Sequence, residues 1–202
     1  ALAELPTTII SDEAYHDLEY GPGSHTMLEF TDRCLVVNTF SKRYAMTGWR
    51  LGWLMAPKDF IRPLRNLQQN LFICANAFVQ KAGIAALENA APDVERMKAE
   101  YDGRRKYIVP RLRSLGFEVP AAPQGAYYVF ADASRFGRDS VALAHRLLER
   151  AHVTVTPGID FGPRGEAFLR FSYANSLENI TEALKRLESV LPRASEAPQP
   201  AD

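Results

Sequence analysis

One lysine stands out as a candidate for chemistry, because it follows an apolar run and precedes several small residues. Lys42 lies in NTFSKRYAMTGWRLGW, residues 38–53, near the end of the run CLVVNTF. Most lysines are solvated surface charges, and taken alone this one could be another. At the end of a buried strand, however, the amine is partly desolvated and becomes a usable nucleophile for a carbonyl. The stretch therefore predicts Schiff-base chemistry at Lys42.

A second candidate group is SDEAY, residues 11–15, which contains Asp12 and Tyr15. Taken alone, these residues are more typical of a strand-end aspartate that caps a helix and of a tyrosine in the core. Beside a Schiff-base lysine, a buried carboxylate gains a function, because its negative charge keeps a pyridine nitrogen protonated. Asp12 and Tyr15 therefore indicate a functional site only in combination with Lys42.

The third candidate is Arg50, eight positions after the lysine. An arginine beside an apolar run is commonly structural and pairs with a carboxylate. The alternative is a phosphate clamp, in which the guanidinium group and the hydroxyls of Thr39 and Ser41 form charge-assisted hydrogen bonds. In that case Gly48 and Gly52 would allow the backbone to approach the phosphate closely.

These residues are expected at the ends of strands in a helix-covered sheet. Three short runs are apolar in the manner of buried strands, namely TTIISDE (7–13), CLVVNTF (34–40) and RLGWLMAP (50–57). The following segment, 58–72, has apolar residues at helical spacing. In open α/β sheets of this kind, ligands bind beyond the carboxyl ends of the strands. Asp12, Glu13 and Lys42 are the polar groups at such ends.

The second half of the chain predicts a separate α+β layer. A long charged helix is expected to end at Gly116, with Pro110 near its end. After it come two strand-like runs, 153–158 and 167–174, with amphipathic helices on either side. The last residues are rich in proline and alanine, which is typical of a disordered tail.

Composition excludes some classes of protein. The 202 residues include 24 basic and 24 acidic side chains, so no net charge favours a polyanion, and nucleic acid is a poor candidate partner. Cys34 and Cys74 lie in apolar surroundings and are expected to be buried free thiols in a reducing compartment. No apolar run is long enough to span a membrane, and we expect a cytoplasmic protein. The four histidines show no metal spacing, so we assign no metal.

Five motifs occur in an order that resembles a known family. They are SDEAY, TFSKRYAMTGWRLGW, PQGAYYVF, TPGIDFG and FLRFSYA. Together they resemble the carboxyl-terminal half of a class I/II pyridoxal-phosphate-dependent aminotransferase of fold type I, over roughly residues 6–190. The resemblance implies an α/β fold: the last few strands and helices of the large-domain sheet, followed by a small α+β domain. The expected divisions are 1–100 for the cofactor-binding portion, 101–191 for the small domain and 192–202 for the tail.

The resemblance also implies roles for the candidate residues. Lys42 would form the Schiff base with pyridoxal 5′-phosphate and then move the proton between the substrate Cα and C4′. Asp12 would pair with the pyridine nitrogen, and Tyr15 with the ring oxygen. The cofactor phosphate would be held by Thr39, Ser41, Arg50.

For the substrate, the resemblance points to Arg170 in the motif FLRFSYA. Considered alone, Arg170 is more typical of an outward-facing strand residue or a core ion pair. In the family, the arginine at this place binds the substrate α-carboxylate, a task that suits a planar guanidinium group. Tyr127 and Tyr128 are expected to be core aromatics, or at most part of a pocket wall.

The expected activity is transamination between an amino acid and a 2-oxo acid by a homodimer, with no nucleic acid or membrane partner. One alternative is a pyridoxal-phosphate-dependent lyase of the same fold, which shares the motif residues. Another is the sensor domain of a pyridoxal-phosphate-binding transcriptional regulator. The motifs of the family's amino-terminal half are missing from this sequence. We therefore expect a truncated portion with an uncovered sheet edge and with weak or no activity by itself.

Overall fold

The computed structural model describes residues 6–192 of the chain. The chain divides into two compact units, Ala1–Lys98 and Ala99–Asp202, and each contains one sheet. The predicted tail, 192–202, lies outside the described residues except for Pro192. The mixed α/β architecture expected from the sequence is confirmed.

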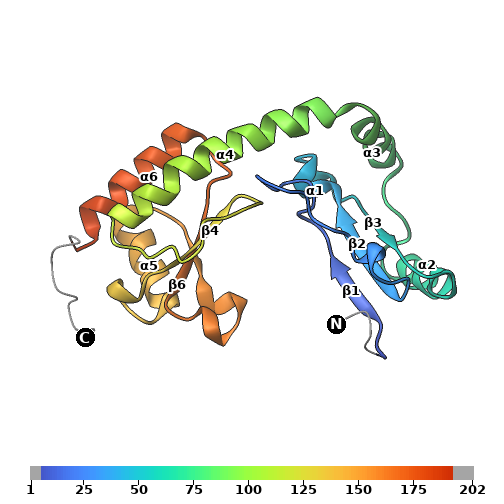
Figure 1. The fold of residues 1–202 in the computed structure, drawn as a ribbon, viewed down its shortest axis with the longest axis horizontal. Coiled ribbons are helices and arrows are strands. Elements are labelled where there is room, and N and C mark those ends of the chain that lie inside the picture. Colours follow the sequence, from blue (N-terminus) through green and yellow to red (C-terminus); the bar gives the residue numbers. More distant parts are fainter. Residues whose placement is uncertain (1–5, 193–202) are drawn as a thin grey trace. The chain divides into compact units, whose positions relative to one another are not determined.

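The first unit is built on a three-stranded sheet in the order β1-β2-β3 (Figure 1). β1 (Ile9–Asp12) runs parallel to β2 (Cys34–Thr39), whereas β3 (Gly52–Met55) runs antiparallel to β2. The one-turn helix α1 (Phe40–Arg43) and the 3-10 helix η3 (Thr47–Trp49) connect β2 to β3. The chain reverses there through Ala45 and Arg50, whose φ angles are 53° and 54°.

Only the middle strand of this sheet is well buried. Cys34, Leu35 and Val36 of β2 are buried, but Ile10 of β1 is 71% exposed and Leu54 of β3 is 40% exposed. The prediction of three buried strands is therefore wrong for β1 and β3. Each of these strands has one neighbouring strand among the described residues, which leaves its other edge open.

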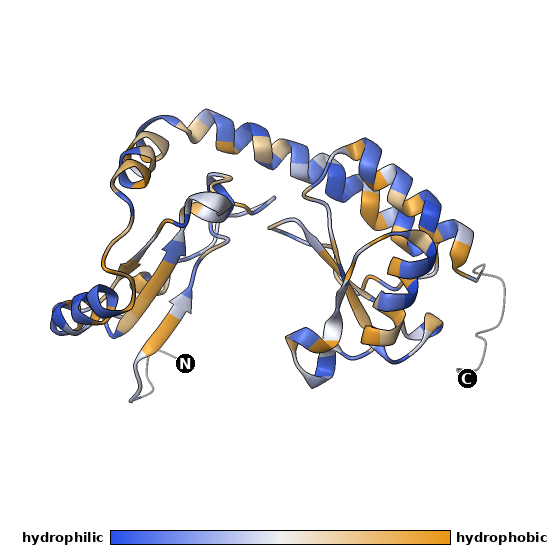
Figure 2. Cartoon of the chain, turned by 180° about the vertical axis from the view of Figure 1, so that it is seen from behind, coloured by the Kyte–Doolittle hydropathy of each residue, from blue (hydrophilic) through white to orange (hydrophobic). Residues whose placement is uncertain are grey.

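The helices of the first unit leave apolar side chains in solvent. α2 (Lys58–Phe72) has no buried residue, and Leu67 and Leu71, from its predicted apolar stripe, are 57% and 69% exposed. Figure 2 shows hydrophobic residues along the strands of the same unit. Apolar side chains of this unit are thus left uncovered by its other described residues. The remaining elements of this unit are η2 (Met27–Glu29) and α3 (Ala77–Asn89).

The second unit contains an antiparallel sheet in the order β4-β6-β5 (Figure 1). Its strands are β4 (Tyr128–Asp132), β5 (Thr156–Pro157) and β6 (Phe168–Ser172). Its helices are α5 (Ser140–Ala151), α6 (Leu177–Val190) and the part of α4 (Ala91–Ser114) from Ala99 onward, with the 3-10 helices η4 (Ser134–Phe136), η5 (Gly158–Phe161) and η6 (Pro163–Gly165).

The core of the second unit lies between one face of the sheet and these helices. Leu169 and Phe171 of β6 are buried together with Leu147 of α5 and Leu187 of α6. Along β6, Leu169 and Phe171 alternate with Phe168, Arg170 and Ser172. These three residues lie on the opposite face of the sheet, because successive side chains of a strand point to opposite sides. The sheet therefore presents Arg170 on the face away from this core.

The two cysteines differ in their surroundings. Both are free, but Cys34 is buried and Cys74 is exposed, so the predicted burial is wrong for Cys74. Cys74 lies in the connection between α2 and α3 and is not part of the sheet. Burial raises the pKa of the Cys34 thiol, and the negative charges of Glu13 and Asp32 raise it further. Among residues 6–192, no helix has the length and apolar character needed to cross a membrane.

This difference predicts that one thiol reacts and the other does not. Because the reactive species is the thiolate, the raised pKa and the burial of Cys34 should both protect it near pH 7. In the folded chain, an aromatic disulfide reagent should titrate Cys74 rapidly, and Cys34 only after urea is added. The Cys74→Ser variant should then show no fast phase. A fast phase in that variant would show that Cys34 is accessible.

Candidate active site

The parallel strands β1 and β2 bring the first candidate residues to one edge of the sheet. Asp12, the last residue of β1, is in register with Val37 of β2, and α1 begins directly after β2. The Tyr15 ring lies in the turn after β1, and Lys42 Nζ is 5.7 Å from the centre of that ring. The structure thus places an amine and a phenol side by side beyond the carboxyl ends of two strands.

A second contact ties the same turn to α1. Arg43, next to the lysine, forms an ion pair with Asp17, and its guanidinium group lies 5.2 Å from the centre of the Tyr44 ring. Asp17 has a φ of 65°, so the turn after β1 closes through a left-handed residue. These contacts hold Lys42 and Tyr15 on facing segments.

Asp12 does not have the surroundings expected from the sequence. Its side chain is exposed, and its Oδ1 accepts a hydrogen bond of 3.1 Å from the backbone N–H of Ala14. The expectation of a buried carboxylate at this position is therefore wrong for the structure. Asp12 ends a strand whose far edge is open, so nothing among the described residues covers it.

The buried carboxylate belongs instead to Glu13, which is 4% exposed. Its Oε1 accepts hydrogen bonds from the hydroxyls of Ser11 (3.1 Å) and Thr26 (3.0 Å) and from the backbone N–H of Met27 (2.9 Å). Its Oε2 lies 3.3 Å from His16 Nδ1. Glu13 therefore joins the end of β1 to the segment that precedes β2. Sequence reasoning placed Glu13 at a strand end but gave it no role, because its partners at 26 and 27 are distant in sequence.

Loss of the Glu13 carboxylate is expected to destabilise the first unit. Glu13→Ala leaves two hydroxyls and one N–H without their acceptor, which should lower the free energy of unfolding by about 2–4 kcal/mol. Both tryptophans, Trp49 and Trp53, lie in the first unit, so urea unfolding followed by tryptophan fluorescence reports on it.

A matched control is Glu88→Ala on α3, where the side chain is exposed. This change should shift the unfolding free energy by less than about 0.5 kcal/mol. Equal stability of the Glu13 and Glu88 variants would contradict the anchoring role of Glu13.

The hydroxyl residues before Lys42 form a connected group. Thr39 is the N-cap of α1, and its hydroxyl oxygen accepts from the N–H of Ser41 at 3.0 Å. The same hydroxyl lies 2.9 Å from the Ser41 hydroxyl and 3.2 Å from the carbonyl oxygen of Leu51. The hydroxyl of Thr47 donates to the carbonyl oxygen of Ser41 at 3.0 Å. These bonds fix the loop that carries Lys42.

Arg50 ends this loop and is exposed. Its Nη1 donates to the carbonyl oxygen of Thr47 at 3.0 Å, and within the described residues no carboxylate pairs with it. The sequence also allowed a structural role for Arg50, in which it pairs with a carboxylate. Among the described residues Arg50 does not have such a partner. The guanidinium group is available to an anion.

The two glycines of the loop differ from the expectation. A Cβ atom at Gly52 would lie 2.7 Å from the carbonyl oxygen of Asn38, because β3 is paired with β2 at this point. Gly52 therefore permits the pairing of β3 with β2, a role that the sequence did not indicate. A Cβ at Gly48 would meet no atom within 4 Å, so this structure gives no packing reason for that glycine.

Arg170, in the second unit, lies close to two aromatic rings. Its guanidinium carbon lies 4.3 Å from the centre of the Tyr128 ring and 4.8 Å from that of Phe161. Its Nη2 also donates to the hydroxyl of Thr156 at 3.2 Å. Both rings lie close to the guanidinium group, whose planar edge suits a planar acceptor such as a carboxylate. Of the two structural alternatives, the outward-facing strand residue agrees with the position of Arg170, whereas no ion pair of Arg170 is found among the described residues. The contact between Tyr128 and Arg170 depends on the pairing of β4 with β6.

The donor set of the first unit fits a small anionic aromatic aldehyde. Near the ends of β1 and β2 this unit offers the amine of Lys42, the phenol of Tyr15, the carboxylate of Asp12 and the guanidinium group of Arg50. No metal is implied, and in the described part of the chain no three His, Cys, Asp or Glu side chains are grouped to hold one.

Comparison with known proteins identifies one family. The model of a family described as aminotransferase class I and II matches residues 2–187. A (5-formylfuran-3-yl)methyl phosphate transaminase of Methanocaldococcus jannaschii is 41% identical over 187 residues, which is 91% of this chain and 50% of that protein. A valine–pyruvate aminotransferase of Mycobacterium tuberculosis is 40% identical over 188 residues, 91% of this chain and 48% of that protein.

Solved structures agree with this result. The crystal structure of an aromatic aminotransferase from Pyrococcus horikoshii has a TM-score of 0.84 at 37% identity, and the match covers 90% of this chain and 50% of that one. An aminotransferase structure from Mycobacterium tuberculosis has a TM-score of 0.84 at 41% identity, with 91% and 48% covered. The chain thus spans about half the length of the relatives it matches.

Proposed function

The chain belongs to the aminotransferase class I and II family, and we propose that it takes part in amino-group exchange between an amino acid and a 2-oxo acid, with pyridoxal 5′-phosphate as cofactor. The single observation that carries the proposal is the Lys42 amine, 5.7 Å from the Tyr15 ring beyond the carboxyl ends of β1 and β2. Because the chain spans half the length of its relatives, the activity is proposed for an enzyme of their full length that contains this sequence, called the complete enzyme below.

When bound, pyridoxal 5′-phosphate supplies an aldehyde and an electron-accepting ring. Lys42 would hold the cofactor through its aldehyde group and would act as the base that moves a proton at the substrate Cα. Asp12 would keep the pyridine nitrogen protonated through its negative charge, and the Tyr15 hydroxyl would bind the ring oxygen. The exposure of Asp12 leaves its carboxylate accessible to a ring nitrogen, which is compatible with this role.

Thr39, Ser41 and Arg50 are proposed to bind the cofactor phosphate. Arg50 supplies the positive charge, and its lack of a carboxylate partner within the described residues supports this role. Ser41 is buried and its hydroxyl is bonded to Thr39, so these hydroxyls must turn outward to meet a phosphate oxygen. Arg170 is proposed to bind the substrate α-carboxylate through the free edge of its guanidinium group.

The reaction class can be tested with the complete enzyme and two assays. A transaminase consumes one 2-oxo acid for each amino acid converted and forms no ammonia, whereas a lyase releases ammonia without a second oxo acid. Stoichiometric use of the acceptor supports the proposal. Ammonia release that does not depend on an acceptor would contradict it. The chain by itself is expected to be a poor catalyst, and a rate equal to that of a full-length relative would contradict that expectation.

A homodimer and a cytoplasmic location belong to the same proposal. The free thiols of Cys34 and Cys74 support a reducing compartment. Exposed apolar side chains of the first unit support self-association, because contiguous apolar patches of this kind commonly mark an interface.

Removal of apolar surface from α2 is expected to weaken that association. The double change Leu67→Glu and Leu71→Glu places charges on two side chains that are already exposed, so folding should be preserved. Sedimentation velocity should show a dissociation constant raised at least about tenfold. The control is Gln68→Glu and Asn70→Glu, on exposed polar positions of the same helix. Equal effects of the two double variants would show that charge alone, and not apolar contact, governs assembly.

A further inference from the structure

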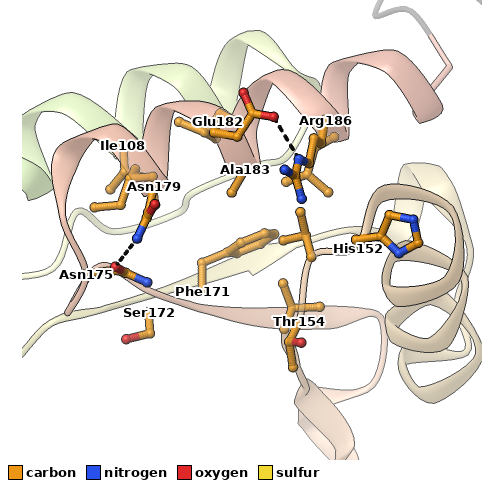
Figure 3. A pocket seen from close by; sticks show the side chains of 15 residues that line it. Ile108, His152, Thr154, Phe171, Ser172, Asn175, Asn179, Glu182, Ala183 and Arg186 are labelled. Atoms are coloured by element: carbon orange, nitrogen blue, oxygen red, sulfur yellow. Dashed lines mark hydrogen bonds and ion pairs between the residues drawn. The ribbon is translucent and has the colours of Figure 1, made fainter.

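A pocket of about 390 Å³ lies in the second unit, outside the proposed active site. Most of its lining comes from α6, the end of β6 and residues 152–155, which lead into β5, and α4 adds Ile108 (Figure 3). β5 pairs with β6 only at Thr156 and Pro157, so the preceding residues separate from β6. This separation opens the space in which the pocket forms. Its volume lies near the lower end of the range of about 300–1,000 Å³ that is usual for small-molecule sites.

One stripe of α6 forms a long side of the pocket. Asn179, Ala183 and Arg186 are four and three residues apart and therefore lie on one face of the helix. From Asn179 to Arg186 the helix rises roughly 10 Å, about two turns. The small side chain of Ala183 stands between the two polar ones and leaves room there. The stripe has a polar group at each end and an apolar centre.

The first end of the pocket has a positive charge. Arg186 donates from Nε to Glu182 Oε1 at 2.8 Å, and among the described residues its two terminal nitrogens make no hydrogen bond. Figure 3 shows its guanidinium group directed into the pocket. Two parallel N–H groups on a planar fork match the geometry of a carboxylate.

The other end has an amide pair. Asn179 Nδ2 donates to Asn175 Oδ1 at 2.9 Å, which leaves the Nδ2 of Asn175 and the Oδ1 of Asn179 without a partner in the described part of the chain. A free donor beside a free acceptor suits a hydroxyl group, which can accept and donate at once. Between the two ends lies the ring of Phe171, which is 4% exposed (Figure 3).

From this arrangement we infer that the pocket binds a small organic monocarboxylate with a flat apolar body and a distal hydroxyl group. The carboxylate pairs with Arg186, the body lies over Phe171 and Ala183, and the hydroxyl meets Asn175 and Asn179. Neither Lys42 nor Arg170 lines the pocket, and the inference does not rest on the proposed function.

A phosphate or other dianion fits less well than a monocarboxylate. The hydrogen bond from Arg186 lowers the pKa of Glu182, so Glu182 carries a negative charge at neutral pH beside the guanidinium group. This charge offsets part of the attraction that a second negative charge on the ligand would need. The apolar centre of the pocket would also remain in water if only an inorganic ion bound.

The inference can be tested with 3-(4-hydroxyphenyl)propanoate, whose polar ends suit the spacing along α6. Binding to the 202-residue chain is measured by saturation-transfer NMR titration, which works with self-associating proteins. We expect saturable binding that Arg186→Gln weakens at least about tenfold, because a charge-assisted hydrogen bond is lost. Lys185→Gln removes the same charge from the neighbouring, exposed residue outside the pocket and should change the affinity less than about twofold.

Three further variants test the shape of the pocket, the hydroxyl contact and the location of the site. Ala183→Leu fills the centre of the pocket without a change of charge and should abolish binding. Asn179→Ala should weaken 3-(4-hydroxyphenyl)propanoate about threefold or more but leave 3-phenylpropanoate unchanged, since only the first ligand has a hydroxyl group. Arg170→Gln should leave both ligands unaffected, which distinguishes this pocket from the proposed active site.

Three results would overturn the inference. They are the lack of saturable binding up to about 10 mM ligand, equal weakening by Arg186→Gln and Lys185→Gln, or retained binding in Ala183→Leu. Circular dichroism of each variant establishes that it is folded before it is scored.

Discussion

Replacing Lys42 by alanine is expected to abolish the borohydride-stable attachment of pyridoxal 5′-phosphate at this position and to lower the transamination rate of the complete enzyme by at least about a thousandfold. The physical reason is that the proposed function gives one amine two tasks. It would bind the aldehyde group of the cofactor, and it would move the proton at the substrate Cα. No other lysine of the chain belongs to the loop 39–50 that carries this amine.

The measurement is peptide mass spectrometry after treatment with the cofactor and borohydride. It can be made on the 202-residue chain, so it does not depend on catalytic activity. At stoichiometric cofactor, the peptide containing Lys42 should carry most of the label. Lys58, an exposed lysine at the start of α2, is the control, and Lys58→Ala should change neither labelling of Lys42 nor the rate. Labelling spread evenly over the surface lysines would contradict the role of Lys42.

The second large effect is expected at Arg170. Arg170→Gln removes a guanidinium group that can form two charge-assisted hydrogen bonds with a carboxylate, so kcat/KM of the complete enzyme should fall roughly 10²–10³-fold. The loss should affect the amino acid and the 2-oxo acid alike, because both carry the same α-carboxylate. Attachment of the cofactor to Lys42 should be unchanged, which separates substrate binding from cofactor binding.

The surroundings of Arg170 sharpen this test. Phe161→Leu removes one of the two rings that lie close to the guanidinium group, while Arg170 itself is kept. It should raise KM severalfold, since a looser arginine has to be ordered on binding. The control is Arg164→Gln, at an exposed arginine in η6. Similar kinetics of Arg170→Gln and Arg164→Gln would exclude Arg170 as the carboxylate ligand.

The sequence by itself determined the family and the fold class of this protein. Residue type and spacing within a short segment carry that information, and the block from Ser41 to Gly52 is one such segment. The same block placed Lys42 directly after a strand, because an apolar run, a capping threonine and a short polar turn are local features. Helical periodicity likewise located α2, α4 and α6.

Tertiary structure decided which groups are buried and which meet. Glu13, not Asp12, became the buried carboxylate, since its partners come from residues 26 and 27. β3 turned back antiparallel to β2, which gave Gly52 a role in strand pairing that no local pattern contains. The ring of Tyr128 comes from β4, which is distant from Arg170 in sequence and meets it only through strand pairing. Burial and cross-strand contact depend on residues that are distant along the chain, and for that reason the fold had to be known before they could be assigned.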